Sequence, residues 1–337
     1  MDPTSSSSVD RALAWLAGVQ APTGELPAWA SPLDVAVPSW TLDPLNFITA
    51  LAAVALDAID HPRAAAIVDA AVAFVVCERQ QNGLWRYWAS TNDQTGFTPA
   101  DADDTACCSL AASLRGHDPT RNIALLLANR DRAGRFRTWF VPRGRGGLRL
   151  RAALWDERSR SVRRERAALW ETTEAEPGDV DAVVNANVCR YLGPAAPAAA
   201  ARWVVDEIRA GNEIGADKWH RNATTLYLSV ADGARRGVPE FTDAEGAIVD
   251  RIAGAWALGR IEAPLDRAQA ALALQAYGAA PAVLGELLDA LESTQTREGC
   301  WERSVFYYGG PKELFGWGSE ALTTAYAAAA LARGVRA

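Results

Sequence analysis

The chain has 337 residues, enough for one large domain or two of average size, and its net charge of −7 argues against general binding of nucleic acid. Hydrophobic residues make up 49% of it and charged residues 22%, the balance of a soluble globular protein without a membrane span. Alanine dominates the apolar residues, which predicts a largely helical fold. The 13 tryptophans exceed what a core of this size uses, and the surplus indicates an aromatic-lined cavity.

The beginning of the chain is rich in serine. We expect residues 1–8 to form a disordered tail and residues 9–335 to form a single domain. No signal peptide is evident, and the five cysteines include no C-x-x-C pair. We therefore expect these cysteines to be small core residues of a cytoplasmic protein in a reducing compartment.

An apolar segment that ends near a glutamine and turns at a glycine recurs along the chain. The copies occupy residues 14–29, 73–88, 124–139 and 289–304, of which the third is the weakest. Glycine in this place is the expected end of a helix. In the last three copies an aromatic residue stands two positions after the glycine, where it would pack beneath the turn: Trp85, Phe136 and Trp301.

Most of these turns lead, after a loop, to a second helix with an acidic residue at or near its start and small or apolar residues on every face. The six such segments are residues 43–56, 101–114, 179–192, 217–230, 265–278 and 318–331. A helix without a polar face is buried all round, whereas the first helix of each pair is amphipathic. Six helix pairs, repeating about every 50 residues, predict an all-α fold, a double-layered α/α toroid with an axial cavity. The acidic starts would then gather at one mouth of this cavity.

The longest interruption of the pattern is the segment 130–166. It contains 13 arginines and four acidic residues and predicts a long loop, or a lid, inserted into the toroid. Its guanidinium groups could clamp a diphosphate or lie against anionic lipid. The alternative is a solvated, partly disordered loop.

Three carboxyl groups stand within four positions at the start of the second inner helix, in D-A-D-D-T-A at residues 101–106. Complementing the helix dipole explains Asp101, in capping position, but a third adjacent carboxylate adds repulsion. Carboxyl groups packed together beside an apolar cavity raise the pKa of one of their number. Such a group stays protonated and can give its proton to a weak base, even an alkene.

The D-x-D-D-T-A motif and the Q-x(2–3)-G-x-W turns resemble those of the class II terpene cyclases. Their superfamily includes squalene–hopene cyclases, diterpene cyclases and protein-prenyltransferase β-subunits. The resemblance implies an isomerase-type reaction of isoprenoid biosynthesis, in which protonation starts the cyclisation of a prenyl diphosphate or a prenylated small molecule. Asp103 would protonate a terminal alkene or epoxide, and Asp101 and Asp104 would hold and polarise it. No redox cofactor is needed, and Mg²⁺ is expected only with a diphosphate substrate.

In this family, aromatic rings stabilise the travelling carbocation by cation–π attraction, about 2 kcal/mol when desolvated. The rings expected to do so here follow a helix turn or precede an inner helix, and they are Trp85, Trp88, Trp219, Trp301, Tyr307, Phe315 and Trp317. Each of them taken alone is also typical of a core. His220 stands at the start of an inner helix, where it would face Asp103 or serve as a structural hydrogen-bonding residue.

Polar residues on the third inner helix form a further group. Asp181, Asn185 and Asn187 lie in an otherwise apolar segment, and buried amides need partners. They would bond across to neighbouring inner helices, or else shape the acid site or hold a cation together with Glu320. No histidine or cysteine spacing indicates a metal site.

Two other functions stay open at this point. A carbohydrate-active toroid, a glycosidase or lyase, would use two carboxylates about 5–10 Å apart, such as Asp103 with Asp181 or Glu320. A non-catalytic toroid would bind a lipid or a protein partner.

Members of the resembled family usually have two toroidal domains, so either one axial cavity suffices here or a second copy completes the site in a homodimer. An isoprenoid substrate would also bring the protein into peripheral contact with a membrane.

Overall fold

The computed structural model describes residues 7–141, 152, 154, 167–279 and 281–334. Most of the arginine-rich segment that we expected as a loop or lid lies outside the described residues, as do residues 1–6. The last two residues of the expected tail cap and begin the first helix. Ser8 is its first residue, and Ser7 caps it by accepting a hydrogen bond from the backbone N–H of Asp10 at 3.1 Å.

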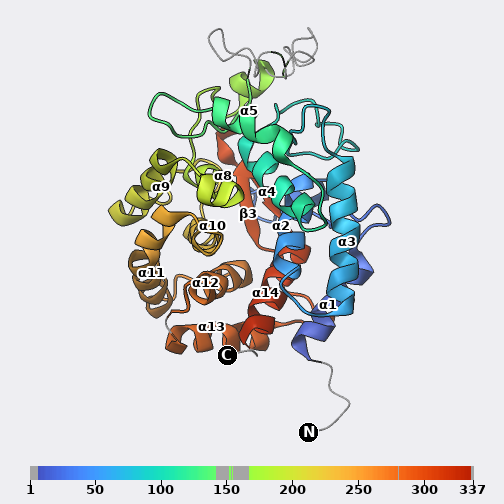
Figure 1. Cartoon of the computed structure of the whole chain (residues 1–337). Coiled ribbons are helices and arrows are strands. Elements are labelled where there is room, and N and C mark those ends of the chain that lie inside the picture. Colours follow the sequence, from blue (N-terminus) through green and yellow to red (C-terminus); the bar gives the residue numbers. More distant parts are fainter. Residues whose placement is uncertain (1–6, 142–151, 153, 155–166, 280, 335–337) are drawn as a thin grey trace.

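Six buried helices form a closed ring, which can be followed in Figure 1. Helix α2 packs against α4, the ring continues through α8, α10 and α12 to α14, and α14 packs against α2 again. Each overlaps one of the six predicted inner helices. Their bounds are α2 (Asn46–Leu56), α4 (Ala102–Ser113), α8 (Ala182–Leu192), α10 (Ala223–Arg235), α12 (Pro264–Tyr277) and α14 (Glu320–Gly334). Small residues let these helices approach closely on all sides, as along 327–330 of α14, where four alanines are fully buried.

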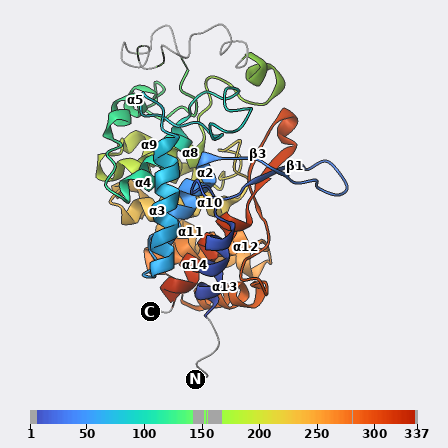
Figure 2. The same cartoon turned by 90° about the vertical axis from the view of Figure 1, so that its right-hand side faces the viewer.

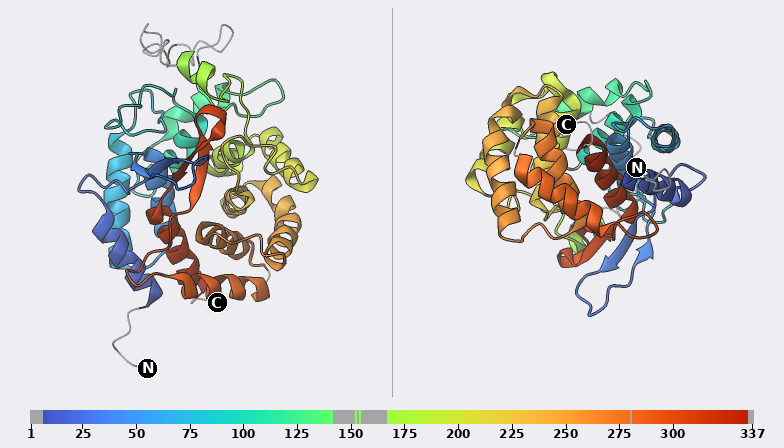
Figure 3. Two further views of the ribbon diagram at one scale, coloured as in Figure 1. Left: turned by 180° about the vertical axis from the view of Figure 1, so that it is seen from behind. Right: turned by 90° about the horizontal axis from the view of Figure 1, so that it is seen from below.

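A second layer of helices lies outside the ring, and Figure 3 shows part of it as α9 and α11, in yellow to orange. Its helices are α1 (Ser8–Val19), α3 (Pro62–Cys77), α5 (Ile123–Ala128), α9 (Ala198–Ala210), α11 (Glu245–Ala257) and α13 (Pro281–Thr294). All but the short α5, which has no polar side chain, are amphipathic, as predicted. On α9, for example, Val204 and Ile208 are buried, whereas Arg202 and Asp206 are exposed. The buried stripes of the other five pack on helices of the ring.

The recurring glycine turns are joined to the ring by one repeated hydrogen bond. The backbone N–H two positions after the glycine donates to a side-chain oxygen on an inner helix, over 2.7–3.2 Å. The donor and acceptor residues are Leu26 with Thr49, Trp85 with Thr105, Phe136 with Asn185, and Trp301 with Thr324. The glycines have φ of 86–98°, a left-handed conformation that favours glycine. This bond explains why the turn and the inner helix repeat together.

A small antiparallel sheet departs from the expected all-α fold. Its strands are β1 (Trp29–Pro32), β2 (Thr41–Leu42), β3 (Val305–Gly309) and β4 (Phe315–Gly318), in the order β2-β1-β4-β3. Figure 2 shows it with strands from both ends of the sequence, blue and red, side by side. Strands of two to five residues carry too little alternation to be predicted, and the pairing of β1 with β4 joins segments almost a whole chain apart.

The axis of the ring is closed at the end where the inner helices terminate. Arg190 of α8 and Asp232 of α10 are buried there, with Nε 2.5 Å from Oδ2, and Arg235 and Arg236 also pair with Asp232. Burial raises the pKa of Asp232, but the three guanidinium groups outweigh it and hold this pKa well below its usual range. The cavities on either side of Arg190 have volumes of only about 20 and 30 Å³.

Two further expectations concern cysteines and membranes. Cys107, Cys108 and Cys189 are buried, as predicted for core thiols, but Cys77 is exposed. Its position near the end of an outer helix turns it away from the ring. Among the helices of the described ranges, none is both long and apolar enough to cross a bilayer.

The repeated hydrogen bond gives a stability prediction. Thr324→Val keeps the shape of the side chain but leaves the buried N–H of Trp301 without its acceptor, so we expect the free energy of unfolding to fall by about 1–3 kcal/mol. Thr323→Val, on the same helix and equally buried, removes only a bond to a carbonyl in its own helix and should cost less than about 1 kcal/mol. Equal losses for both variants in urea unfolding would contradict this explanation.

Candidate active site

An aromatic cavity opens at the end of the ring where the inner helices begin. Its volume is about 390 Å³. The rings that line it are Tyr87, Trp88, Phe97, Trp139, Trp219, Tyr307, Phe315 and Trp317. All four strands of the small sheet contribute lining residues, so the pairing of the two chain ends builds one wall of the cavity.

A second, much smaller cavity of about 20 Å³ lies next to the first. Tyr87, Trp139, Trp219 and Tyr307 border both cavities. The carboxyl groups of the D-x-D-D motif line the smaller one. A ligand in the aromatic cavity is therefore separated from these carboxyl groups only by the shared rings.

Asp103, in the first turn of α4, has partners on both oxygens. Its Oδ1 accepts a hydrogen bond from Nδ2 of Asn187 at 2.8 Å, and its Oδ2 lies 3.5 Å from Nε2 of His220. His220 Nδ1 lies 3.1 Å from the carbonyl oxygen of Phe306, which can only accept, so Nδ1 carries a proton and Nε2 faces the carboxyl group. Burial lowers the pKa of His220, but Asp103 and the charge of Asp217 outweigh it and raise this pKa above its usual value.

Asp101 and Asp104 have different surroundings. Asp101 caps α4 by accepting the backbone N–H of Asp104 at 2.7 Å, and burial raises its pKa to about 6. Neither carboxyl oxygen of Asp104 has a hydrogen-bond partner in the described part of the chain, and this residue is 1% exposed. Burial, followed by the charge of Asp101, raises the pKa of Asp104 well above its usual value. A buried carboxyl group without donors is most stable in its protonated form.

Another aspartate, Asp43, lies in the wall of the larger cavity just before α2. Its Oδ2 accepts the indole N–H of Trp88 at 3.0 Å and that of Trp317 at 2.6 Å. Its Oδ1 accepts a hydrogen bond from the side-chain amide of Asn92 at 2.6 Å. These bonds tie together residues from three distant parts of the sequence.

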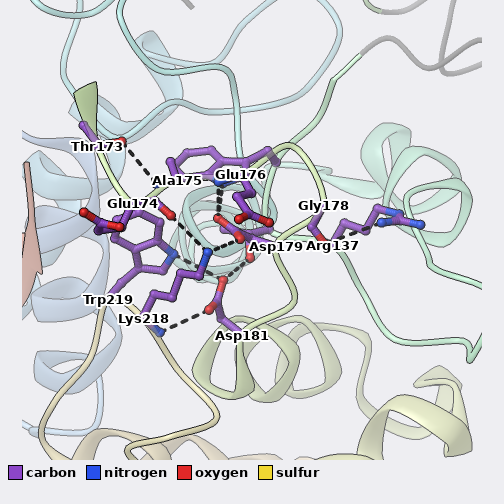
Figure 4. Close-up of polar contacts among 12 residues, drawn as sticks. Arg137, Thr173, Glu174, Ala175, Glu176, Gly178, Asp179, Asp181, Lys218 and Trp219 are labelled. Carbon is purple, nitrogen blue, oxygen red and sulfur yellow. Dashed lines mark hydrogen bonds and ion pairs between the residues drawn. The ribbon is translucent and has the colours of Figure 1, made fainter. Parts of the chain in front are cut away.

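The carboxyl groups before α8 bind Lys218 and the indoles of two lining tryptophans, and Figure 4 shows Asp179 and Asp181 beside Lys218 and Trp219. Asp179 pairs with Lys218 at 2.6 Å and accepts the indole N–H of Trp139 at 3.1 Å. Asp181 accepts the indole N–H of Trp219 and the backbone N–H of Lys218, both at 3.2 Å. Burial raises the pKa of Asp181 to about 7.

The structure brings together most of the rings selected from the sequence. Trp88, Trp219, Tyr307, Phe315 and Trp317 line the larger cavity, and Trp219 and Tyr307 also line the smaller one. Trp85 and Trp301 do not lie among the residues described as lining these two cavities. They are fully buried, and their indoles donate to backbone carbonyls of outer helices, as expected of core residues beneath the turns.

Two of the polar candidates lie elsewhere. Glu320 pairs with Arg303 at 2.6 Å and is not among the described lining residues of the two cavities. Asn185 holds the glycine turn by bonding both the N–H and the carbonyl of Phe136. Within the described ranges, no group of three or more histidine, cysteine or acidic side chains is placed to hold a metal ion.

Sequence reasoning did not select Tyr87, Phe97 and Trp139, whose rings line the larger cavity, and it named Asn187 only within a polar group. A signal for Trp139 was present, because it ends the third repeat copy as Trp88 ends the second. Asn187 belonged to the polar group on α8, but no sequence pattern shows which of two asparagines, two residues apart on different faces of the helix, meets Asp103. Tyr87 lies beside Trp88, with ring centroids 5.3 Å apart, in a loop whose course the sequence does not fix.

Comparison with solved structures finds likenesses over the whole chain at low sequence identity. A protein from Actinoplanes matches with a TM-score of 0.68 and 18% identity, covering 98% of this chain and 99% of that one. The type II terpene cyclase MstE from Scytonema matches with a TM-score of 0.61 and 14% identity, over 98% of both chains. A variant of MstE in complex with geranylgeranyl dihydroxybenzoate, its substrate, matches with a TM-score of 0.63 and 14% identity, covering 98% and 97%. No family model and no curated protein matches the sequence. The fold is thus terpene cyclase-like.

The surroundings of Asp104 predict a pH-dependent stability. Because its pKa is raised in the folded state, the folded state binds more protons than the unfolded state above about pH 4, so this residue costs stability as the pH rises. Asp104→Asn cannot ionise and should unfold at a higher temperature than the wild type, by a margin that is larger at pH 8 than at pH 4.5.

The control for this experiment is Asp93→Asn, which changes an exposed carboxyl group on the loop that leads to α4. It should shift the melting temperature little at either pH. A gain for Asp104→Asn that is the same at both pH values would show that the carboxyl group of Asp104 does not change its proton occupancy on folding.

Proposed function

We propose that this chain is a class II terpene cyclase built on an α/α toroid, which starts the cyclisation of a linear isoprenoid by protonation. One observation carries the proposal: the carboxyl group of Asp103 borders a small buried cavity directly beside an aromatic one, with Asn187 on one oxygen and His220 near the other. The terpene cyclase-like fold of the whole chain supports it.

Protonation of an alkene is unfavourable, so the acid has to be strong and its conjugate base stabilised. When Asp103 gives its proton to a terminal C=C bond, one carbon gains a C–H bond and the other becomes a tertiary cation. The amide of Asn187 and a protonated His220 would both stabilise the carboxylate that is left. The raised pKa of His220 favours the protonated form that would stabilise this carboxylate.

The aromatic rings suit the next step, in which further double bonds attack the cation and close rings. Tyr307 has rings on several sides: the centroid of Trp219 lies 5.9 Å away with the planes 6° apart, and the centroid of Tyr87 lies at 4.9 Å. Ring faces attract a nearby cation without offering it a nucleophile. Loss of a proton or addition of water would end the reaction without any change of oxidation state.

A prenylated small molecule fits the cavity better than a prenyl diphosphate. Among the described residues that line the larger cavity, the charged one is Asp43, an acid that would repel a diphosphate. The geranylgeranyl dihydroxybenzoate bound to the MstE variant is a compound of the favoured kind. With such a substrate the reaction would need no Mg²⁺.

A carbohydrate-active site has less support. It would need a second carboxyl group across an open polar groove, but Glu320 is paired with Arg303 and eight aromatic rings line the larger cavity. The remaining alternative, a toroid that binds without catalysing, makes the opposite prediction for a change of Asp103.

The decisive experiment is incubation with geranylgeranyl dihydroxybenzoate, farnesyl and geranylgeranyl diphosphate and a neutral polyprene, followed by mass spectrometry. We expect a cyclised isomer of at least one of them. Asp103→Asn, which keeps the shape of the side chain and loses its acidic proton, should lower the rate at least about 10³-fold while the substrate still binds.

Asp93→Asn again serves as the matched control and should leave the rate unchanged, since its carboxyl group is exposed. An undiminished rate in Asp103→Asn would rule out the assigned acid. If no isoprenoid is cyclised and a polysaccharide is cleaved instead, the proposed reaction is wrong.

A further inference from the structure

The tryptophans of the larger cavity share one kind of hydrogen-bond acceptor. Their indole N–H groups all donate to aspartates that stand just before inner helices. The donors are Trp88, Trp139, Trp219 and Trp317, and the acceptors are Asp43, Asp179 and Asp181. The core indoles of Trp85 and Trp301 donate to neutral carbonyls instead. Trp203 and Trp256 do donate to glutamates, but both lie on outer helices away from the cavity.

Asp43 differs from Asp179 in its charge balance. Asp179 is paired with the ammonium group of Lys218. Asp43 has no ion-pair partner among the residues that the structure describes, and its three hydrogen-bond donors, Trp88, Trp317 and Asn92, are all neutral. The negative charge of Asp43 is therefore hydrogen-bonded but not neutralised.

The orientation of the rings follows from these bonds. A carboxylate attracts the positive edge of an indole, which leaves the electron-rich faces for neighbouring rings and for the cavity. Trp317 lies 5.5 Å from Tyr307 and 5.7 Å from Tyr87, measured between ring centroids. The carboxylate and the ring faces thus contribute negative potential to the same wall.

The carboxyl group of Asp43 is held in place by its hydrogen bonds. Three N–H donors already bond its two oxygens, which fixes their position in the cavity wall. A negative charge held in this way can act as a counter-charge, because attraction to a cation is strong where water is excluded.

We propose that Asp43 is a positioning residue and a fixed counter-charge, and that the larger cavity binds a cation against Trp88, Trp317 and Tyr307. The cations that fit are of one class: a hydrophobic chain that ends in, or develops, a diffuse positive charge, such as a quaternary ammonium ion. In the proposed cyclisation the cation would be the carbocation formed after Asp103 has given its proton, and this part of the inference rests on the proposed function.

The test measures binding without turnover. The probes are the farnesyltrimethylammonium ion and its neutral isostere, in which carbon replaces the nitrogen, and calorimetry gives their affinities. We expect the wild type to bind the ammonium ion at least about tenfold more tightly than the isostere. Asp43→Asn keeps one acceptor oxygen and removes the charge, so it should remove most of this preference while the affinity for the isostere changes less than about twofold.

Asp34→Asn is the matched control, since it removes one negative charge from the exposed loop between β1 and β2 and should leave the preference intact. Equal losses of both probes in Asp43→Asn would show a structural role only, and unchanged affinities would show none; either result overturns the proposal. If Asp43→Asn does not fold, the wild type still decides, because equal binding of the two probes excludes a counter-charge.

The outcomes separate this inference from the proposed function. A cation preference that depends on Asp43, in a protein that cyclises no isoprenoid, would leave the inference standing and remove the proposed reaction. Cyclisation that depends on Asp103, in a protein without the cation preference, would support the proposed reaction and rule out the cation site at Asp43.

Discussion

Carboxyl groups are kept out of water where the inner helices begin, and the rest of this structure depends on how each of them is satisfied. The ring brings the starts of α2, α4 and α8 to one end of the molecule, and each start carries at least one aspartate. An ionised carboxylate cannot stay buried unless donors or cations surround it. The indoles, amides and the histidine around the cavity are those partners, so the acids and the aromatic lining require one another.

Three carboxyl groups near the cavity differ in the hydrogen bonds that they receive. Asp104 receives none in the described part of the chain, Asp103 receives one from Asn187 and faces His220, and Asp43 receives three. Burial without donors raises the pKa of Asp104 well above its usual value. In the proposed reaction Asp103 would be the acid, and Asp43 would be the counter-charge of the inferred cation site.

The buried helices of the ring and the place of the three aspartates at the start of one of them could be predicted from the sequence, because both depend on local patterns. Small residues on every face identify a buried helix, and three aspartates ahead of such a helix identify an unusual site. The small sheet could not be predicted, since its strands are short and pair across almost the whole chain. The same limit applies to single contacts: Trp85 and Trp88 are three residues apart, yet one lies in the core and the other lines the cavity. Glu320 likewise occupies the same register as Asp103, but a nearby arginine draws it into an ion pair.

The ion pair of Arg190 and Asp232 closes the axis of the ring at the end opposite the aromatic cavity, which makes this cavity blind-ended. A long flexible molecule can enter such a cavity end first, with its polar group left at the entrance, but the closed end offers no second exit. A product formed in the cavity would have to leave through the same opening by which its substrate entered. A fused, rigid product of the proposed cyclisation would be wider than the open chain that entered, so the strands and rings at the rim would have to part for it. Product release through that rim, rather than the chemical step, would then limit the rate of turnover.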